Sequence, residues 1–284
     1  ARRRIVSVTE FAPAKVNLAL HITGQRADGY HLLDSIVGFA SIGDKLTVSE
    51  ATTYQLTATG AFVEAMPKVE DNLITKAVNW FAVNCSENPN VAVSLEKNLP
   101  AAAGIGGASA DAAAVIRALA KLWDKPLPTA QDLLFLGADV PMCLASNTCR
   151  AGGIGEELSG VPSLSGTPIV LVNPRVAVPT PKVFGALKSR INLAITNPDL
   201  TAETDVIEWV LAQRNDMQDA AKVIAPAIND VLMALESTFP RIARMSGSGA
   251  TCFGIYGTQD AANEAAQKIA TINPNWWVTC GQLI

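Results

Sequence analysis

A glycine- and alanine-rich stretch from Leu99 to Asp111 constrains the fold of this chain more than any other segment. It follows an apolar, strand-like run at residues 91–95 and leads into a run at 109–123 whose apolar residues recur at helical spacing. Its three glycines can adopt backbone conformations that larger residues avoid. The first amides of a helix lack internal partners and carry the positive end of its dipole. The stretch is therefore either an anion site, most often one for phosphate, or a plain tight turn.

The stretch matches neither of two common nucleotide-binding motifs. A Walker P-loop has Gly-Lys-Ser or Gly-Lys-Thr after its first glycine, and this stretch contains no lysine. A dinucleotide-binding fingerprint would have its third glycine at the position of Ser109. Taken alone, the stretch leaves the phosphate site and the tight turn equally open.

Composition favours a compact, enzyme-like protein. The chain has 284 residues, 49% hydrophobic and 17% charged, against roughly 25% charged in an average domain. A net charge of −4 gives no basic footprint for nucleic acid, and no apolar run is long enough to span a membrane. The five cysteines are odd in number and lack C-x-x-C spacing, which favours reduced thiols in the cytoplasm. Because the chain has only two histidines, we expect no metal site built from side chains.

Lys15 and Asn17 lie on the same face of a predicted strand at residues 11–22, since side chains alternate between the two faces of a strand. The other face carries apolar residues, Val16 and Leu18 among them. Two interpretations stay open for the polar pair. It either faces water from an edge strand or is placed for a function.

Several other polar or aromatic residues have both a structural and a functional interpretation. Tyr30 and His31 follow an Asp28-Gly29 turn signal, and their rings either pack internally or stack on a planar ligand. Asp139 is a lone carboxylate after a predicted helix, so it is either a cap or turn residue or an acid placed for chemistry. Asp111 lies near the start of its helix, where a carboxylate interacts favourably with the helix dipole, and it could also reach a bound cation.

Local turn and capping signals predict the remaining element boundaries. They are a turn at Gly43-Asp44 within a β region at 32–50, a helix cap at Asp71-Asn72, a capping box of Thr129 and Asp132 before a helix through Leu136, and a domain boundary at 162–167.

Three segments, in this order, resemble the signature motifs of the GHMP small-molecule kinases. They are Ala12-Pro-Ala-Lys-Val-Asn-Leu18, Pro100-Ala-Ala-Ala-Gly-Ile-Gly-Gly107 and Ser246-Gly-Ser-Gly-Ala250. Four more segments are similar to one branch of this family, whose acceptor substrate is a cytidine diphosphate ester of a small polyol. They lie at 24–31, 70–74, 136–141 and 178–181. Seven segments in the right order, spread over residues 11–256, make coincidence implausible.

The resemblance implies an α+β, two-domain GHMP kinase fold. The N-terminal domain, residues 1–160, would be similar to ribosomal protein S5 domain 2 and would carry the ATP-binding glycine loop. The C-terminal domain, residues 161–284, would be ferredoxin-like. The phosphoryl donor would be ATP with Mg²⁺ carried by the ATP. The partner would be a small-molecule substrate of isoprenoid precursor synthesis, and the chain a monomer or weak homodimer that binds neither nucleic acid nor membrane.

The resemblance also assigns roles to individual residues. Asp139 would be the catalytic base, with Lys15 beside it. Four residues would contact the substrate, with its cytosine stacked against the second and third of them: Asn17, Tyr30, His31 and Thr180. The residues that would bind ATP are Asn72, Pro100, Ala101, Ala102, Ala103, Gly104, Ile105, Gly106, Gly107, Ala108, Ser109 and Ala110.

Two residues of the glycine loop depart from the family pattern. Ala108 stands where the family usually has a third glycine, so we expect helical backbone there. Ala110 stands where the family has a second serine, which leaves Ser109 as the nearest hydroxyl to phosphate or to the water shell of the metal. We expect altered affinity and not loss of activity.

Two other functions compete with this interpretation. Another GHMP kinase, specific for homoserine or mevalonate, is disfavoured by the segments at 28–31 and 137–141. A catalytically inactive nucleotide sensor with a protein partner would have lost its base or its lysine, and both Lys15 and Asp139 are present.

Overall fold

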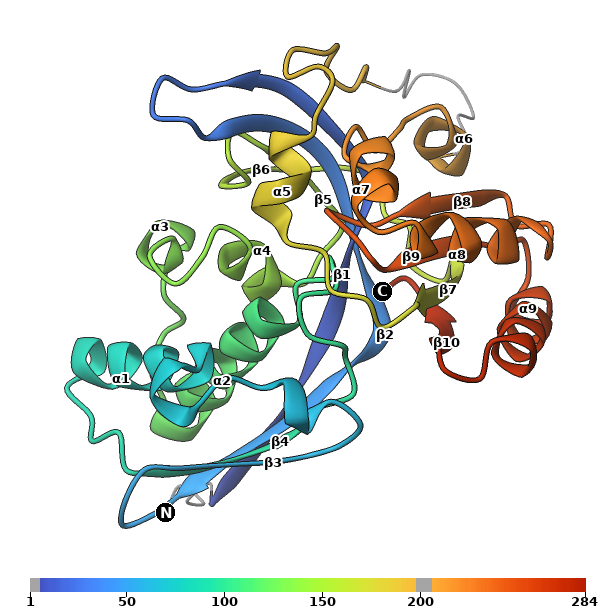
Figure 1. Ribbon diagram of the computed structural model, residues 1–284. Helices are drawn as coiled ribbons and strands as arrows, with labels where there is room; N and C mark the ends of the chain where they lie inside the picture. Colours follow the sequence, from blue (N-terminus) through green and yellow to red (C-terminus); the bar gives the residue numbers. More distant parts are fainter. Residues whose placement is uncertain (1–5, 198–205) are drawn as a thin grey trace. The chain divides into compact units, whose positions relative to one another are not determined.

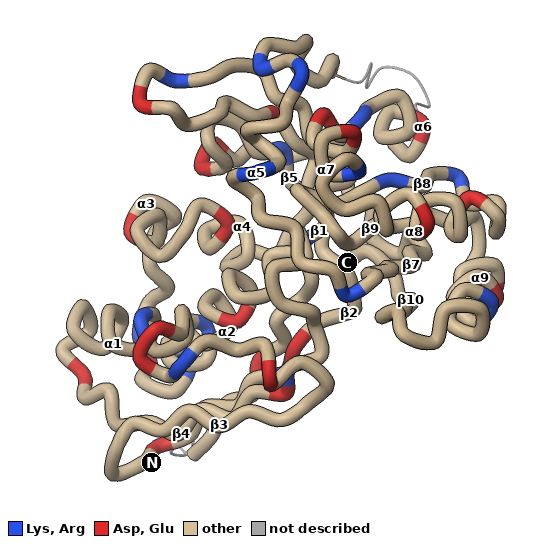
Figure 2. Tube along the Cα trace, viewed as in Figure 1, with Lys and Arg blue, Asp and Glu red and all other residues tan. Residues whose placement is uncertain are grey.

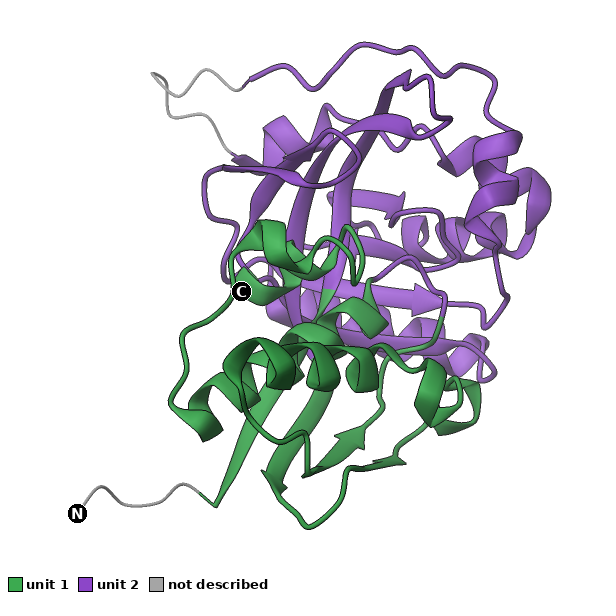
Figure 3. Ribbon diagram, turned by 90° about the vertical axis from the view of Figure 1, so that its left-hand side faces the viewer, with its two compact units in different colours: residues 1–14, 43–101, 106–146 green, residues 15–42, 102–105, 147–284 purple. Residues whose placement is uncertain are grey.

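The computed structural model describes residues 6–197 and 206–284 (Figure 1). Contacts within the chain divide it into two compact units, which are described one at a time (Figure 3). Unit 1 comprises residues 1–14, 43–101 and 106–146, and unit 2 comprises residues 15–42, 102–105 and 147–284. Each unit consists of segments that alternate along the chain with segments of the other unit. The domain boundary predicted between residues 160 and 161 stays a prediction.

Two long strands, β1 (Ser7–Gln25) and β2 (His31–Glu50), contribute residues to both units. Within unit 1, the last residues of β2 pair antiparallel with β4 (Val91–Glu96), and β4 pairs in parallel with β3 (Gln55–Thr59). Every second residue of β4 is buried, as expected for a strand with one face on the core. The strand predicted at 91–95 is therefore confirmed.

The helices of unit 1 begin where the sequence supplies capping groups. Asn72 is the N-cap of α1 (Leu73–Cys85), and its Oδ1 accepts a hydrogen bond from Ile74 N at 2.9 Å. Thr129 and Asp132 form the predicted capping box, although the helix it begins is shorter than predicted. The remaining helical segments of this unit are η1 (Val63–Ala65), η2 (Val69–Asp71), α2 (Gly107–Trp123), α3 (Ala130–Leu133) and α4 (Val140–Ala145).

Helix α2 is the buried helix of unit 1. From Ala110 to Ala120 every residue except Arg117 is buried, and six of them are alanine. Small side chains let neighbouring backbones approach on all sides, and α2 packs directly against α1. The helix begins two residues before the predicted start, at Gly107, so Ala108 has the helical backbone that was expected of it.

Unit 2 contains a four-stranded antiparallel sheet in the order β10-β7-β9-β8, against which α8 and α9 pack. The early residues of β2 pair with β5 in the same unit, and β5 pairs with β6. The further elements are β5 (Cys149–Gly152), β6 (Glu157–Gly160), β7 (Pro168–Asn173), α5 (Thr180–Gly185), α6 (Val206–Leu211), α7 (Gln218–Ile224), α8 (Ala227–Glu236), β8 (Ile242–Met245), β9 (Cys252–Ile255), α9 (Gln259–Ile272) and β10 (Trp277–Gln282).

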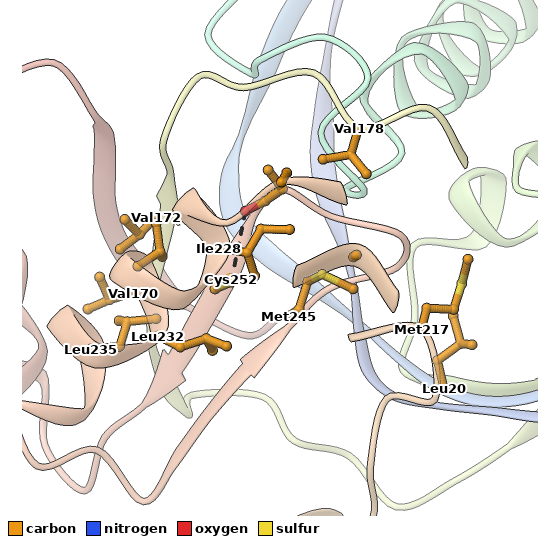
Figure 4. Packing of buried hydrophobic residues seen from close by; sticks show 14 of the residues in the cluster. Leu20, Val170, Val172, Val178, Met217, Ile228, Leu232, Leu235, Met245 and Cys252 are labelled. Carbon is orange, nitrogen blue, oxygen red and sulfur yellow. Dashed lines mark hydrogen bonds between the residues drawn. The ribbon is translucent and has the colours of Figure 1, made fainter. Parts of the chain in front are cut away.

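The core of unit 2 is shown in Figure 4. Ile228 and Leu232 from α8 belong to one buried cluster with Val170 and Val172 from β7 and Cys252 from β9. Each such side chain contributes about 1.5–3 kcal/mol by leaving water. This cluster anchors the strands from which the third sequence motif extends.

Two predictions about the strands are wrong. The Gly43-Asp44 pair is not a turn, because β2 continues through it. A Cβ at residue 43 would lie 2.3 Å from Ala12 O, so glycine serves there for close approach of two strands. The interpretation in which Lys15 and Asn17 face water is also wrong, because both side chains are buried.

Charged residues are interspersed along the described parts of both units, as Figure 2 shows. All five cysteines are present as thiols. In the ranges that the structure describes, no helix has both the length and the apolar character required to cross a membrane.

Candidate active site

The glycine stretch ends in an open helix start in unit 1. Gly106 is the N-cap of α2 with a left-handed backbone (φ 64°), and no described side chain caps this helix. The first hydrogen bond of the helix runs from Ala110 N to Gly106 O. The amides of residues 107–109 therefore have no partner within the helix, and a helix N-terminus of this kind binds anions.

The middle of the stretch, Ala102–Ile105, belongs to unit 2, where it meets the other two sequence motifs. Ser246 Oγ donates a hydrogen bond to Gly104 O at 2.9 Å and accepts one from Asn17 N at 3.0 Å. Lys15 N donates to Ile105 O at 3.0 Å. A Cβ at residue 104 would lie 2.4 Å from Ser246 O, so this contact requires glycine. Three motifs that are far apart in the sequence thus converge on one point.

Lys15 and Asn17 form a buried polar network in unit 2. Lys15 Nζ donates to Asn17 Oδ1 at 2.9 Å, and Asn17 Nδ2 donates to Ser35 Oγ at 2.8 Å. Ser35 Oγ in turn donates to Ala19 O. The shared face predicted for Lys15 and Asn17 is confirmed. An ammonium group only 6% exposed and fixed by its neighbour is held in one orientation.

Asp139 lies in unit 1 as the half-buried N-cap residue of α4, and its side chain makes no capping hydrogen bond. The Asp139 carboxylate therefore does not cap α4. Lys15 belongs to unit 2, so the pairing of Asp139 with Lys15 stays a prediction.

A buried cluster of three charged groups precedes the glycine stretch in unit 1. Lys97 Nζ donates to Asp44 Oδ2 at 2.5 Å and to Asp111 Oδ2 at 2.6 Å. Asp44 Oδ1 accepts from the amides of Asn98 and Leu99. The cluster therefore joins β2, the residues after β4 and helix α2. It fixes the backbone just before the glycine stretch, and it gives Asp111 an ammonium partner that neither predicted role included.

The protonation of this cluster follows from its burial. Burial lowers the pKa of Lys97, but Asp111 and Asp44 more than offset this and raise it above its usual value. Burial raises the pKa of Asp111 to about 7, against the opposing effect of Lys97. Asp111 Oδ1 is buried with no hydrogen-bond partner. The single ammonium group of Lys97 can balance the charge of only one carboxylate, and Asp111 is the acid with the raised pKa.

Tyr30, His31 and Thr180 line one cavity of unit 2, with a volume of about 590 Å³. The ring of His31 is stacked on that of Phe184, with centroids 4.4 Å apart and planes 16° apart. Tyr30 is 61% exposed, and the Arg26 guanidinium carbon lies 6.0 Å from the centroid of its ring. Burial lowers the pKa of His31, and Arg190 lowers it further. His31 Nε2 is buried and unpartnered, as expected where a polar ligand atom would bind.

Two family models match the sequence. "GHMP kinases N terminal domain" covers residues 72–154 and "GHMP kinases C terminal" covers residues 205–275, which together are more than half of the chain.

The chain belongs to the GHMP kinases.

Similar proteins agree over almost the full length of this GHMP kinase. The 4-diphosphocytidyl-2-C-methyl-D-erythritol kinase of Roseobacter denitrificans is 49% identical, over 97% of this chain and 93% of its own. The enzyme of the same name from Ruegeria pomeroyi is 45% identical, over 98% and 100%. A crystal structure of 4-(cytidine 5'-diphospho)-2C-methyl-D-erythritol kinase superposes with a TM-score of 0.80 at 30% identity, over 97% and 99% of the two chains.

A homoserine kinase from Cytophaga hutchinsonii shares the fold alone, with a TM-score of 0.70 at 16% identity, over 100% of this chain and 96% of its own. The predicted α+β GHMP kinase fold and the resemblance drawn from the seven segments are confirmed.

Several residues of this GHMP kinase were missed in the sequence. Phe184 carried a signal, since it lies one helical turn after Thr180, but its stacking on His31 depends on tertiary structure. Asp44 was hidden by a strong local turn signal. Lys97 carried no signal, because its partners lie 53 and 14 residues away. Within the described residues, no group of three or more His, Cys, Asp and Glu side chains could hold a metal ion.

Proposed function

We propose that this GHMP kinase transfers the γ-phosphoryl group of ATP to the 2-hydroxyl of 4-diphosphocytidyl-2-C-methyl-D-erythritol, in the non-mevalonate isoprenoid precursor pathway. The observation that carries the proposal is the stacked pair of His31 and Phe184, beside an exposed Tyr30 in a cavity large enough for a nucleoside. Flat rings and an unpartnered ring nitrogen suit a pyrimidine base. Relatives 45–49% identical over nearly the whole chain carry the name of this activity.

In this proposal the glycine stretch binds the phosphates of ATP. The free amides at the start of α2 donate hydrogen bonds to phosphate oxygens, and the alanines and glycines among residues 100–106 leave room for the triphosphate. Ser109 and the backbone at Ala108 and Ala110 complete the site. Asn72 caps α1 and contacts the nucleotide as well.

Mg²⁺ enters this site with ATP. It would supply positive charge that offsets the negative charge of the transferred phosphoryl group. The Ser109 hydroxyl would be the side chain of this loop nearest to the water shell of the ion.

Asp139 and Lys15 perform the proton transfer and the charge stabilisation. Asp139 accepts the proton of the 2-hydroxyl as that oxygen bonds to the γ-phosphorus and the bond to the β-phosphate oxygen breaks. The products are ADP and the phosphate monoester. Lys15, fixed by Asn17, stabilises the developing negative charge on the acceptor oxygen.

The acceptor is held by Asn17, Tyr30, His31 and Thr180, to which the cavity adds Phe184. Thr180 Oγ1 lies 2.7 Å from Ser248 Oγ of the third motif, so the cavity and that motif are in direct contact within unit 2. We further propose a cytoplasmic location, which the five thiols favour, and a monomer or weak homodimer.

A coupled assay of ADP release tests the proposal. The chain is supplied with ATP and Mg²⁺ and, in separate reactions, with 4-diphosphocytidyl-2-C-methyl-D-erythritol, homoserine, mevalonate or no acceptor. We expect turnover only with the cytidine-bearing acceptor. Turnover with homoserine or mevalonate instead would assign another branch of the family. Nucleotide binding without ADP release in any of these reactions would favour the catalytically inactive nucleotide sensor.

A further inference from the structure

The aromatic cavity of unit 2 contains one uncompensated positive charge. Among the described residues that line it, Arg190 is the only Lys or Arg and Asp28 the only acid. Asp28 Oδ2 accepts a hydrogen bond from Arg26 Nη2 at 2.6 Å, so its charge is already balanced. The cavity is therefore positive on account of Arg190.

Arg190 is exposed and has no carboxylate partner within the ranges that the structure describes. Its charge nevertheless reaches the cavity, because Arg190 adds to the effect of burial in lowering the pKa of His31. A His31 imidazole with a lowered pKa is neutral at pH 7. Arg190 is then the group that can balance an anion in this cavity.

The backbone on both sides of Arg190 is anchored. Ser189 Oγ donates to Ile191 O at 3.0 Å and accepts from Ile191 N at 3.3 Å, which closes a tight bend around Arg190. Asn192 donates from both its backbone amide and its side chain to Ile22 O of β1, at 3.1 and 3.0 Å. A guanidinium presented from a fixed bend loses less conformational entropy on binding than one on a loose segment.

We propose that Arg190 binds the diphosphate of the acceptor and so makes the cavity selective for a cytidine diphosphate ester over an uncharged cytidine derivative. The inference rests on the proposed function, which supplies the cytidine and its diphosphate. Once the base is stacked by the aromatic residues, the diphosphate extends from the same nucleoside. The planar guanidinium offers paired N–H donors that match phosphate oxygens, whereas an ammonium group does not.

Binding of cytidine and of cytidine diphosphate, each measured by calorimetry, isolates this role. A non-hydrolysable ATP analogue is present at saturation so that neither ligand occupies the nucleotide site. The variant is Arg190→Gln. The matched control is Lys188→Gln, which removes the same charge from an exposed residue two positions away that does not line the cavity.

The wild-type chain is expected to bind cytidine diphosphate more tightly than cytidine. Arg190→Gln is expected to lower the affinity for cytidine diphosphate about tenfold and to change the affinity for cytidine less than twofold. A charge-assisted hydrogen bond to phosphate is lost in this variant, while the stacking of the base is kept. Arg190→Lys should recover part of the loss. Higher ionic strength should lower the affinity for cytidine diphosphate more in the wild type than in Arg190→Gln. Lys188→Gln should behave as the wild type.

Two results would overturn the assignment, and they are distinguishable. If both ligands bind the wild type but Arg190→Gln leaves their affinity ratio unchanged, or Lys188→Gln lowers that ratio equally, Arg190 does not read the diphosphate and the proposed function stands. If the wild type binds neither ligand, the cavity is no cytidine site, and the proposed function and this inference fail together.

Discussion

At the scale of single residues, burial and fixed partners decide which polar groups are prepared to bind. Lys15, held by Asn17, and His31, stacked on Phe184, are each oriented without a ligand. Sequence alternation correctly placed Lys15 and Asn17 on one face of β1. It could not show that this face is buried, because alternation along a strand tells which side chains share a face and not whether water reaches that face.

Tyr30→Ala tests the aromatic cavity at this scale. Removing an exposed ring that stacks on the base should weaken cytidine binding about tenfold or more, since stacking is worth about 1–3 kcal/mol per base. Affinity for ATP should stay within twofold. Fluorescence or calorimetric titration measures both. Phe135→Ala, which removes another exposed aromatic ring, is the control and should change neither. Equal weakening of both ligands in Tyr30→Ala would eliminate the stacking role.

At the scale of elements, the buried cluster of Asp44, Lys97 and Asp111 links β2, the end of β4 and α2. The sequence predicted each of these elements but not the link. The Gly43-Asp44 pair has a strong local turn signal, and only a lysine 53 residues away reveals that Asp44 belongs inside a strand. Helix starts were predicted well because capping depends on neighbouring residues, as at Asn72 and Thr129.

Lys97→Met should lower the free energy of unfolding by about 3–5 kcal/mol, because it leaves the two buried acidic side chains of the cluster without their cation. Denaturant titration followed by circular dichroism measures this. Lys121→Met is the control: its ammonium is 62% exposed and pairs with Glu10, so its loss should cost less than about 1 kcal/mol. Equal losses in the two variants would show that the cluster contributes no more than a surface pair.

The pKa of Asp111, raised to about 7 by burial, predicts a pH dependence of stability. Between about pH 4 and pH 7 the folded chain keeps a proton that the unfolded chain has released. The unfolding free energy of the wild type, relative to Asp111→Asn, should therefore fall as the pH rises through this window, by at most about 1.4 kcal/mol per pH unit. Denaturant titrations of both proteins at several pH values measure the difference. A difference that does not change with pH would contradict the raised pKa.

At the scale of the whole molecule, the GHMP kinase fold gathers residues that the sequence keeps apart. Within unit 2 the motifs around Asn17, Gly104 and Ser246 meet through hydrogen bonds. Their identity could be predicted from the sequence, since each has its own residue pattern. Their meeting and the contribution of Phe184 could not, because both depend on pairings between segments tens to hundreds of residues apart. The roles of Asp139 and Lys15 together remain a prediction.

The most direct test of the central claim is the turnover of Asp139→Asn with ATP and 4-diphosphocytidyl-2-C-methyl-D-erythritol. Removing the proton acceptor should lower kcat by about 10²–10⁴-fold, while both substrates still bind with near wild-type affinity. Asp260→Asn, on an exposed position of α9, is the control and should turn over normally. A kcat for Asp139→Asn close to that of the wild type would contradict the account.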